Sequence, residues 1–208
     1  MKRIADSTVR RLSAYLRFLE DFEGRGLGTI SSEELAQRGG TTSAQVRKDL
    51  SLFGSFGKRG LGYSVPELSR QLSDILGLDR EWRVVIIGAG KIGAALAQYR
   101  GFHQRGFVVL GAYDINPDKI GRTVEGVAVS DINRIERDFA RELPDIVVLT
   151  VPGDAAQSIL DRVVKTGVKA VLNFATTQLH APADVTVKTV NMAMELEGLS
   201  FALTNRAG

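Results

Sequence analysis

One stretch of the 208-residue chain decides the fold of its larger part: Arg83-Val84-Val85-Ile86-Ile87-Gly88-Ala89-Gly90-Lys91-Ile92-Gly93. The four apolar residues after Arg83 predict a buried strand. A Gly-x-Gly-x-x-Gly pattern follows at once and opens a helix expected over about Ile92 to Gln104. A second strand, Val108 to Tyr113, ends at Asp114, which lies 21 residues beyond Gly93. This order and spacing are typical of a dinucleotide-binding β-α-β unit.

The residue types in this unit suit a nucleotide. The glycines leave room for a pyrophosphate at a helix N-terminus, where free backbone amides attract anions. A carboxylate at Asp114 accepts from ribose hydroxyls and repels a 2′-phosphate, which favours NAD(H) over NADP(H). The motif alone leaves open other adenine dinucleotides, coenzyme A, and a glycine-rich turn that only permits tight packing. The cofactor-binding residues expected here are Gly88, Ala89, Gly90, Lys91, Ile92, Gly93 and Asp114.

Strands and helices continue to alternate toward the C-terminus. Strands are expected over Asp145–Val151, Lys169–Phe174 and Val185–Val190, with a helix near Ala155–Lys165. The alternation predicts a parallel, doubly wound sheet with its ligand beyond the carboxyl ends of the strands. The candidates to lie near the nicotinamide, each of which packing alone also explains, are Pro152 and Gly153, Phe174 and Ala175, and Tyr99.

The first 78 residues show helical periodicity instead. Apolar residues from Leu12 to Phe22 recur at steps of three and four and predict one helix with a buried stripe. Ser31-Ser32-Glu33-Glu34 is a capping box that opens a short helix ending at Gly39-Gly40. Thr42-Ser43-Ala44-Gln45 is a second capping box and opens a third helix. A fourth helix is expected from Pro66 to Gly77.

The third helix and the segment after it suggest DNA binding. Val46, Leu50 and Phe53 share its apolar face, while its polar side chains lie opposite, and residues 56–65 predict a glycine-rich hairpin with a basic tip. Together these elements predict a winged helix-turn-helix, whose polar helix face fits the major groove. The alternative is a small helical domain with a solvated polar face. The expected DNA-binding residues are Ser43, Gln45, Arg47, Lys48 and Ser51 in the helix and Lys58, Arg59, Gly60 and Tyr63 in the hairpin.

Composition narrows the choice of function. The chain holds 27 Lys+Arg against 24 Asp+Glu, and the whole excess lies in residues 1–80, which hold 13 and 10. The absence of cysteine excludes a disulfide scaffold, a Cys-ligated zinc site and thiol catalysis, and no metal site is predicted. No apolar run approaches the ~18 residues of a membrane span.

General acid–base groups are scarce. The only histidines are His103, at the far end of the first nucleotide-domain helix, and His180, in a loop. None of the four tyrosines is followed four residues later by lysine, so the Tyr-Lys pair used by some dehydrogenases is absent. We therefore expect a cofactor that is sensed and not consumed. The alternative is an NAD-dependent oxidoreductase with an N-terminal interaction domain.

The C-terminal segment is expected to form a helix capped by Asn191. Its apolar residues lie on more than one face, which favours burial against a partner subunit over a plain packing helix of the same chain. The predicted organisation is a winged-helix domain (1–78), a Rossmann domain (79–190) and a dimerisation helix (191–208) that is exchanged within a dimer.

Several of these motifs together resemble the Rex redox-sensing transcriptional repressors of bacteria. The matching residues are Val46-Arg47-Lys48-Asp49-Leu50-Ser51, Phe53-Gly54, Arg59-Gly60-x-Gly62-Tyr63, the nucleotide fingerprint, Leu149–Pro152 and Leu172–Ala175. The resemblance spans essentially the whole chain. It implies a cytoplasmic homodimer that binds palindromic operators of fermentative and respiratory genes. It also implies that NADH releases the repressor, that NAD+ competes, and that the C-terminal helices are exchanged between subunits.

Two positions depart from the family pattern. The family usually has an acidic residue at the place of Asn191, near the nicotinamide and an arginine that Arg17 matches here. Neutral Asn191 forms hydrogen bonds but not that ion pair. Thr176 stands where the family commonly has proline. Arg17 and Asn191 are the expected interdomain switch residues, and both departures concern the distinction between NADH and NAD+.

Overall fold

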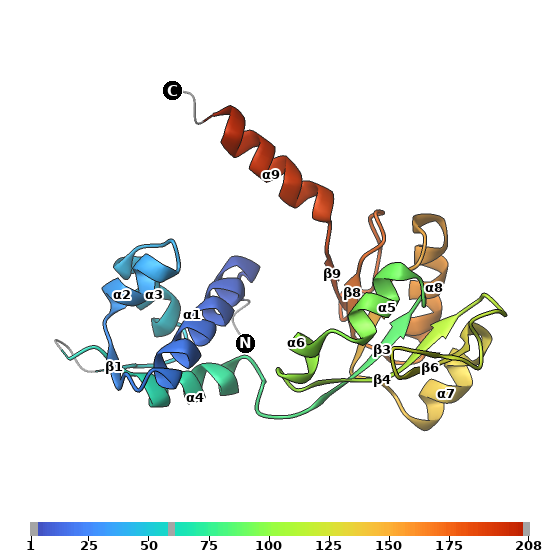
Figure 1. The fold of residues 1–208 in the computed structure, drawn as a ribbon, viewed down its shortest axis with the longest axis horizontal. Coiled ribbons are helices and arrows are strands. Elements are labelled where there is room, and N and C mark those ends of the chain that lie inside the picture. The colour runs from blue at the N-terminus through green and yellow to red at the C-terminus, as the bar shows by residue number, and fades with distance from the viewer. Residues whose placement is uncertain (1–3, 58–60, 206–208) are drawn as a thin grey trace. The chain divides into compact units, whose positions relative to one another are not determined.

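The computed structural model describes residues 4–57 and 61–205, and the chain forms two compact units, Met1–Arg80 and Glu81–Gly208 (Figure 1). The expected boundary between residues 78 and 79 lies close to this division. The first unit is helical, with one small sheet, and the second is a mixed α/β domain, as the sequence predicts. A separate role for residues 191–208 in dimerisation stays a prediction.

The N-terminal unit packs its helices around leucine side chains. Leu12, Leu16 and Leu19, on one stripe of the first helix, are buried among Leu35 and Leu50. The expected amphipathic helix is thereby confirmed. The elements of this unit are α1 (Asp6–Gly24), β1 (Thr29–Ile30), α2 (Ser32–Arg38), α3 (Ser43–Ser51), β2 (Tyr63–Ser64) and α4 (Val65–Ile75).

The two predicted capping boxes differ. At α2 the box is complete: Ser31 Oγ accepts from Glu34 N at 3.1 Å, and Glu34 Oε2 accepts from Ser31 N at 2.8 Å. At α3, Thr42 Oγ1 accepts from Gln45 N at 3.2 Å. The Gln45 side chain does not complete this second box, because its amide donates instead to Asp49 Oδ1 at 2.8 Å.

The predicted hairpin over residues 56–65 runs through residues 58–60, which lie outside the described part of the chain, so its own pairing stays a prediction. Tyr63–Ser64 pairs antiparallel with Thr29–Ile30, more than thirty residues earlier, and Phe56 and Gly57 lie in a loop. Gly57 and Gly62 have φ values of +73° and +77°, and a Cβ at Gly62 would overlap the carbonyl oxygen of Ile30. These glycines therefore allow the loop to turn and its return strand to lie against β1. The expected basic tip, Lys58, Arg59 and Gly60, lies outside the described residues.

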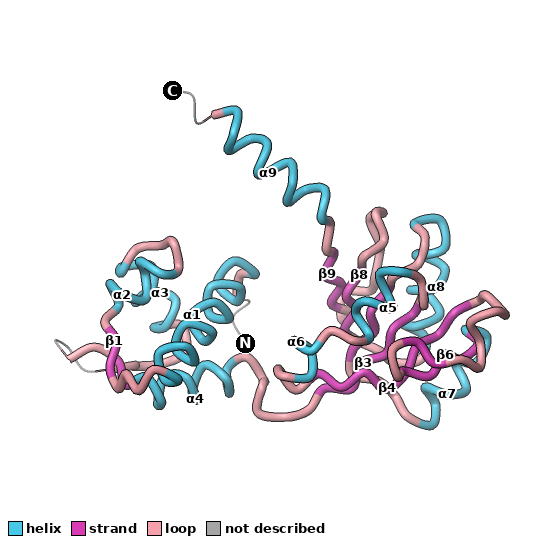
Figure 2. Tube along the Cα trace, viewed as in Figure 1, coloured by secondary structure: helices cyan, strands magenta, loops and turns pink. Residues whose placement is uncertain are grey.

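The C-terminal unit is built on a β-sheet, drawn in magenta in Figure 2. The sheet has seven strands in the order β5-β6-β4-β3-β7-β8-β9. All neighbouring strands are parallel except β5 and β6. The chain leaves β3 toward β4 on one side and later returns to β7 on the other, which creates a topological switch point at β3. The elements are β3 (Trp82–Ile87), α5 (Lys91–Ala97), α6 (Arg100–His103), β4 (Phe107–Asp114), β5 (Thr123–Val124), β6 (Val127–Asp131), η1 (Ile132–Arg134), α7 (Ile135–Arg141), β7 (Ile146–Leu149), α8 (Gly153–Lys165), β8 (Ala170–Asn173), β9 (Thr186–Thr189) and α9 (Met192–Thr204).

Helices cover both faces of this sheet (Figure 1). Successive residues of a strand point to opposite faces. Val85 and Ile87 accordingly belong to the core that includes α7 and α8, whereas Val84 and Ile86 belong to the core that includes Leu96 of α5. The doubly wound architecture expected from the alternating pattern is confirmed.

Of the expected helices, the one after the glycine loop is broken in two, and the C-terminal one is capped as predicted. The helix predicted from Ile92 to Gln104 is broken into α5 and α6 because the backbone of Tyr99 is extended (φ −68°, ψ 102°). The expected cap of α9 is present, since Asn191 Oδ1 accepts from Ala193 N at 3.0 Å. None of the thirteen residues of α9 is buried, and its large apolar side chains are 61% to 70% exposed.

Candidate functional site

The glycine-rich loop after β3 is packed against the end of β7. Gly88 has a φ of +103°, and a Cβ at Gly93 would overlap the carbonyl oxygen of Gly88. Thr150 Oγ1 donates to Gly88 O at 2.6 Å and to Ile87 O at 3.1 Å. Gly88 and Gly93 therefore allow the strand, the loop and α5 to approach one another, and Thr150 fixes the loop in place.

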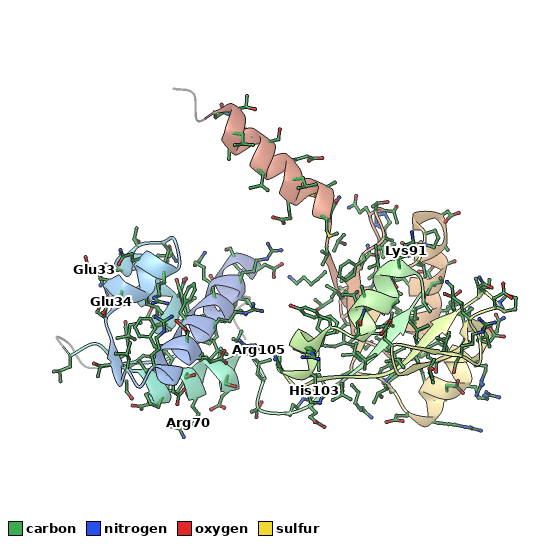
Figure 3. The ribbon with its side chains drawn as sticks, viewed as in Figure 1. Glu33, Glu34, Arg70, Lys91, His103 and Arg105 are labelled. Carbon is green, nitrogen blue, oxygen red and sulfur yellow. The ribbon has the colours of Figure 1, made fainter. Side chains whose placement is uncertain are left out.

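Gly90 differs from the other two glycines of the motif. Within the described part of the chain, no atom beyond its neighbours lies within 4 Å of a Cβ built at Gly90. Gly90 is the N-cap of α5, where no side chain caps the helix, and it lines a pocket. Its backbone is thus accessible to a ligand, and Lys91 follows it as the first residue of α5 (Figure 3).

Asp114 at the end of β4 is buried, with 8% of its surface exposed. Its Oδ2 accepts from Ala89 N at 2.8 Å and from Lys119 Nζ at 3.0 Å, and its Oδ1 accepts from Asn116 N at 2.8 Å. Burial raises the pKa of Asp114, but these hydrogen bonds outweigh it and hold the pKa below the usual aspartate value. The carboxylate is therefore charged at neutral pH and ties the glycine loop to the next loop.

A pocket of about 600 Å³ lies beyond the carboxyl ends of β3, β4 and β7. Apolar side chains line part of it, and polar groups line the rest. This combination suits a flat base with a ribose at its edge. Its apolar residues include Ile115, Ile132, Val151 and Ile159, and its polar residues include Asp114, Lys119, Asn133, Ser158 and Arg162.

A second cavity, of about 290 Å³, has a different character. It is lined almost wholly by apolar side chains, among them Val84, Phe102 and Val148, with Lys188 at one side. It contains none of the glycine loop. The nucleotide site is therefore assigned to the larger pocket.

Only some of the predicted cofactor-binding residues line this pocket. Gly88, Gly90, Asp114 and Pro152 line it. Phe174 and Ala175 follow β8, and half-exposed Tyr99 lies between α5 and α6. The pocket thus includes residues of the glycine loop, Asp114 and one nicotinamide-side candidate, Pro152, while Tyr99, Phe174 and Ala175 lie outside its lining. The other predicted residues that do not line it are Ala89, Lys91, Ile92, Gly93, Gly153 and Asn191.

Two side chains that the sequence did not single out fix the loops at this edge. Thr150 holds the glycine loop, as described above. Asn173 is buried, and its Nδ2 donates to the carbonyl oxygens of Ala175 at 3.2 Å and Thr177 at 3.3 Å, while its Oδ1 accepts from Ala175 N at 2.9 Å. Each is a polar residue at the carboxyl end of a predicted strand, and this position is the signal that identifies them.

The helix predicted to face DNA, α3, is fixed to α1 by a buried carboxylate. Asp49 is 1% exposed, and it accepts from Arg11 Nε at 2.6 Å and from a terminal Arg11 nitrogen at 2.7 Å. The Tyr15 hydroxyl, at 3.1 Å, and the Gln45 amide, at 2.8 Å, also donate to it. Burial raises the pKa of Asp49, but these hydrogen bonds keep it below the usual value. Burial and the charge of Asp49 raise the pKa of Tyr15 to about 12.

The predicted DNA-binding residues of α3 are not equally available. Arg47 and Lys48 are exposed, and one Arg47 guanidinium nitrogen donates to Ser32 Oγ at 2.9 Å. Ser51 is exposed and donates to the Lys48 carbonyl oxygen at 2.8 Å. Ser43 is half-buried, and Gln45 is engaged with Asp49.

Tyr63, unlike Arg47 and Lys48, is mostly buried. It is 8% exposed and belongs to the apolar core of the N-terminal unit. Burial raises its pKa. Its ring therefore packs in the core of this unit, and the predicted contact of Tyr63 with DNA stays a prediction.

Arg17 is exposed on α1, on a shallow surface that it forms with Val9, Arg10, Ser13 and Ala14. Asn191 caps α9 in the other unit. A contact between Arg17 and Asn191 stays a prediction.

The two histidines are not part of the pocket at the glycine loop. His103 is an exposed residue of α6 (Figure 3), and His180 is exposed in the loop before β9. Neither lines the nucleotide pocket. In the described ranges, 4–57 and 61–205, no helix combines the length and apolarity needed to cross a bilayer.

A helical unit with exposed Arg47 and Lys48 on α3, followed by a Rossmann domain with a pocket at its glycine loop, is typical of a DNA-binding protein with a dinucleotide-binding domain. Comparison with protein families agrees for each unit. Residues 3–51 match the family described as a putative DNA-binding protein N-terminus, and residues 79–177 match the CoA binding domain family.

Curated relatives match the chain over nearly its full length. It is 43% identical over 204 residues to the redox-sensing transcriptional repressor Rex of Desulfitobacterium hafniense, covering 98% of this chain and 97% of that protein. It is 42% identical to Rex of Thermus thermophilus, covering 98% and 95%. The chain therefore belongs to the Rex family of redox-sensing transcriptional repressors, and that family consists of regulators and not of enzymes.

Solved structures agree with this assignment. A crystal structure of RSP, a Rex-family repressor, in complex with β-NAD+ and operator DNA has a TM-score of 0.93 and 39% identity, covering 99% of this chain and 95% of that one. The complex of RSP with β-NADH has a TM-score of 0.90 and 38% identity, covering 99% and 97%.

Proposed function

We propose that this protein represses transcription in response to the NADH/NAD+ ratio, by binding palindromic operators as a homodimer and dissociating from them when NADH binds. The observation that supports this most is the match over 99% of the chain to a Rex-family repressor holding both NAD+ and operator DNA. A likeness that includes both units supports both activities in one chain.

DNA is bound through α3. Exposed Arg47 and Lys48 enter the major groove, where arginine and lysine contact guanine edges, and Ser43 and Ser51 lie on the same helix. Lys58, Arg59 and Gly60, which precede β2 in the sequence, contact the DNA backbone. In a twofold dimer, the two α3 helices lie about one turn of DNA, ~34 Å, or a multiple of it, apart.

The dinucleotide binds at the glycine loop. Its adenosine occupies the 600 Å³ pocket, its pyrophosphate lies over Gly90, and Asp114 binds the ribose. The nicotinamide extends toward Tyr99, Phe174 and Ala175. Asn191, at the start of α9, forms hydrogen bonds near the nicotinamide, and Arg17 is its partner across the domains.

The dimer is formed through α9. Six large apolar side chains of this helix are at least 61% exposed, which is far more than an isolated soluble chain usually tolerates on one helix. A partner subunit that receives the helix removes this surface from water. The protein works in the cytoplasm, where both its operators and the NADH pool are found.

The deciding experiment titrates NADH and NAD+ separately into the full chain bound to a fluorescent palindromic duplex, obtained by selection from random sequences. We expect fluorescence anisotropy to fall as NADH is added, and NAD+ to shift the NADH midpoint upward. A bound fraction that NADH leaves unchanged would refute the proposed function. Oxidation of NADH in the presence of candidate substrates would instead favour an oxidoreductase.

A further inference from the structure

We infer that Lys119 is a specificity-determining residue of the nucleotide pocket: it binds the adenosine ribose together with Asp114 and reduces the discrimination against a 2′-phosphate. The inference rests on the proposed function, because it concerns the same dinucleotide site. It adds a residue outside the glycine motif, in the loop between β4 and β5.

Lys119 is held at the edge of the pocket by its own loop. The Lys119 amide donates to the Asn116 carbonyl oxygen at 3.0 Å, and the Asn116 side chain accepts from Asp118 N at 2.9 Å. The Lys119 side chain is 34% exposed, and its Nζ lies 3.0 Å from Asp114 Oδ2. Lys119 lines the pocket beside Asp114. The ammonium group is therefore already placed where the ribose hydroxyls arrive.

The hydrogen-bonding capacity of the pair matches a ribose diol. A carboxylate has about four acceptor sites, and Asp114 uses three of them on Ala89 N, Lys119 Nζ and Asn116 N. One acceptor site remains, on Oδ1. An ammonium group has three donors, of which Lys119 uses one on Asp114. One hydroxyl can therefore donate to Asp114, and either hydroxyl can accept from Lys119.

The charge at this position differs from that of a lone carboxylate. A lone acidic residue at the end of the second strand repels a 2′-phosphate, whereas a basic side chain nearby accommodates one. Here the charges of Asp114 and Lys119 balance each other at 3.0 Å. The other cation lining the pocket, Arg162, is paired with Glu136 at 2.7 Å and adds no net charge. The 2′-phosphate of NADP(H) thus meets a smaller electrostatic penalty than Asp114 alone would impose.

The test measures dissociation constants for NADH and NADPH by calorimetry on the full chain and on two variants. We expect the wild type to bind NADH more tightly than NADPH. Lys119→Met removes the cation and should raise the NADPH/NADH ratio of dissociation constants about tenfold, which corresponds to ~1.4 kcal/mol. Asp114→Asn removes the opposing charge and should lower that ratio.

Lys165→Met provides the matched control, because Lys165 is an exposed lysine at the end of α8 that does not line the pocket. It should leave both dissociation constants unchanged. If Lys119→Met leaves the NADPH/NADH ratio of dissociation constants unchanged, whether both affinities persist or fall equally, the inference is overturned. NADH-driven release of DNA would in that case still support the proposed function. A wild type that binds neither dinucleotide would overturn the proposed function itself.

Discussion

Each unit of this protein buries one aspartate, and the two differ in what surrounds them. Asp49 of the N-terminal unit is enclosed by side chains from α1 and α3, whereas Asp114 of the C-terminal unit is bound mainly by backbone amides at the edge of a pocket. The side chains of Arg11, Tyr15 and Gln45 together fill the acceptor sites of Asp49, while Asp114 keeps an acceptor site open. A buried carboxylate therefore orients a helix in one unit, whereas in the other it lines a pocket with an acceptor site free.

The largest effect is expected from replacing Asp49, the carboxylate that joins α3 to α1. Asp49→Ala leaves Arg11, Tyr15 and Gln45 without their common acceptor, and breaking a buried pair costs about 3 kcal/mol. We expect the free energy of unfolding to fall by this amount in urea, and operator binding to fall with it, because α3 loses its fixed orientation. NADH affinity should persist.

The matched control is Asp74→Ala, which removes an exposed carboxylate from α4 in the same unit. Surface substitutions of this kind usually change stability by about 0.5 kcal/mol or less. Equal losses in the two variants would mean that the network around Asp49 adds nothing specific to the stability of the unit.

The next largest effect is expected from replacing Asp114, the carboxylate at the edge of the pocket. Asp114→Ala removes the ribose acceptor and the anchor of Ala89, and a hydrogen bond to a charged group contributes about 2 kcal/mol. NADH affinity, measured by calorimetry, should therefore fall roughly 30-fold. Operator binding without NADH should be preserved. Unchanged NADH affinity would show that other groups bind the ribose.

Lys48 lies next to Asp49 in α3 but is exposed. Replacing Lys48 therefore tests contact with DNA without disturbing the contacts that hold α3 in place. Lys48→Ala should weaken operator binding about fivefold, or ~1 kcal/mol, by removing one cation from the DNA-facing side. Its free energy of unfolding and NADH affinity should equal those of the wild type. A matched loss of stability would assign Lys48 a structural role instead.

The smallest expected effect is on acid stability. Because hydrogen bonds lower the folded-state pKa of Asp49 and Asp114, both stabilise the fold above about pH 4, and this contribution is lost as the pH falls through their folded-state pKa values. Asp49→Asn and Asp114→Asn should each make the decline in unfolding free energy below pH 4 shallower. Urea titrations at a series of pH values measure it, and an unchanged slope would contradict the shifts.

Local patterns predicted those parts of the fold that local chemistry determines. The glycine motif, the capping box at Ser31 and the cap at Asn191 each depend on residues within a few positions of one another, and all three are present. Asp114 was predicted from its spacing, because β4 must end beside the glycine loop. That Lys119, Asn133 and Arg162 line the pocket was not predictable, since these side chains come from segments that lie far from the glycine loop in the sequence.

Distant pairings explain the features that the sequence did not predict. The partner of β2 is β1, which no pattern within residues 56–65 reveals. Strand β6 and helix α7, over residues 127–141, were not predicted, because their buried residues Val129, Ile135 and Phe139 are separated by charged and polar ones. Ile132 and Asn133 of the pocket come from this region and were missed with it. Asp49 was not predicted to be buried, because a charged side chain is almost never fully buried unless it is paired. Its partners Arg11 and Tyr15 lie in another helix, α1, and no local pattern reveals that pairing.

The exposed apolar side chains of α9 make the stability of the proposed dimer a property of the solution as well as of the chain. A helix that is buried only by association adds stability in proportion to the logarithm of protein concentration. Dilution would therefore lower the melting temperature and operator occupancy together. The number of repressor copies in a cell would then set how much NADH is needed to clear an operator.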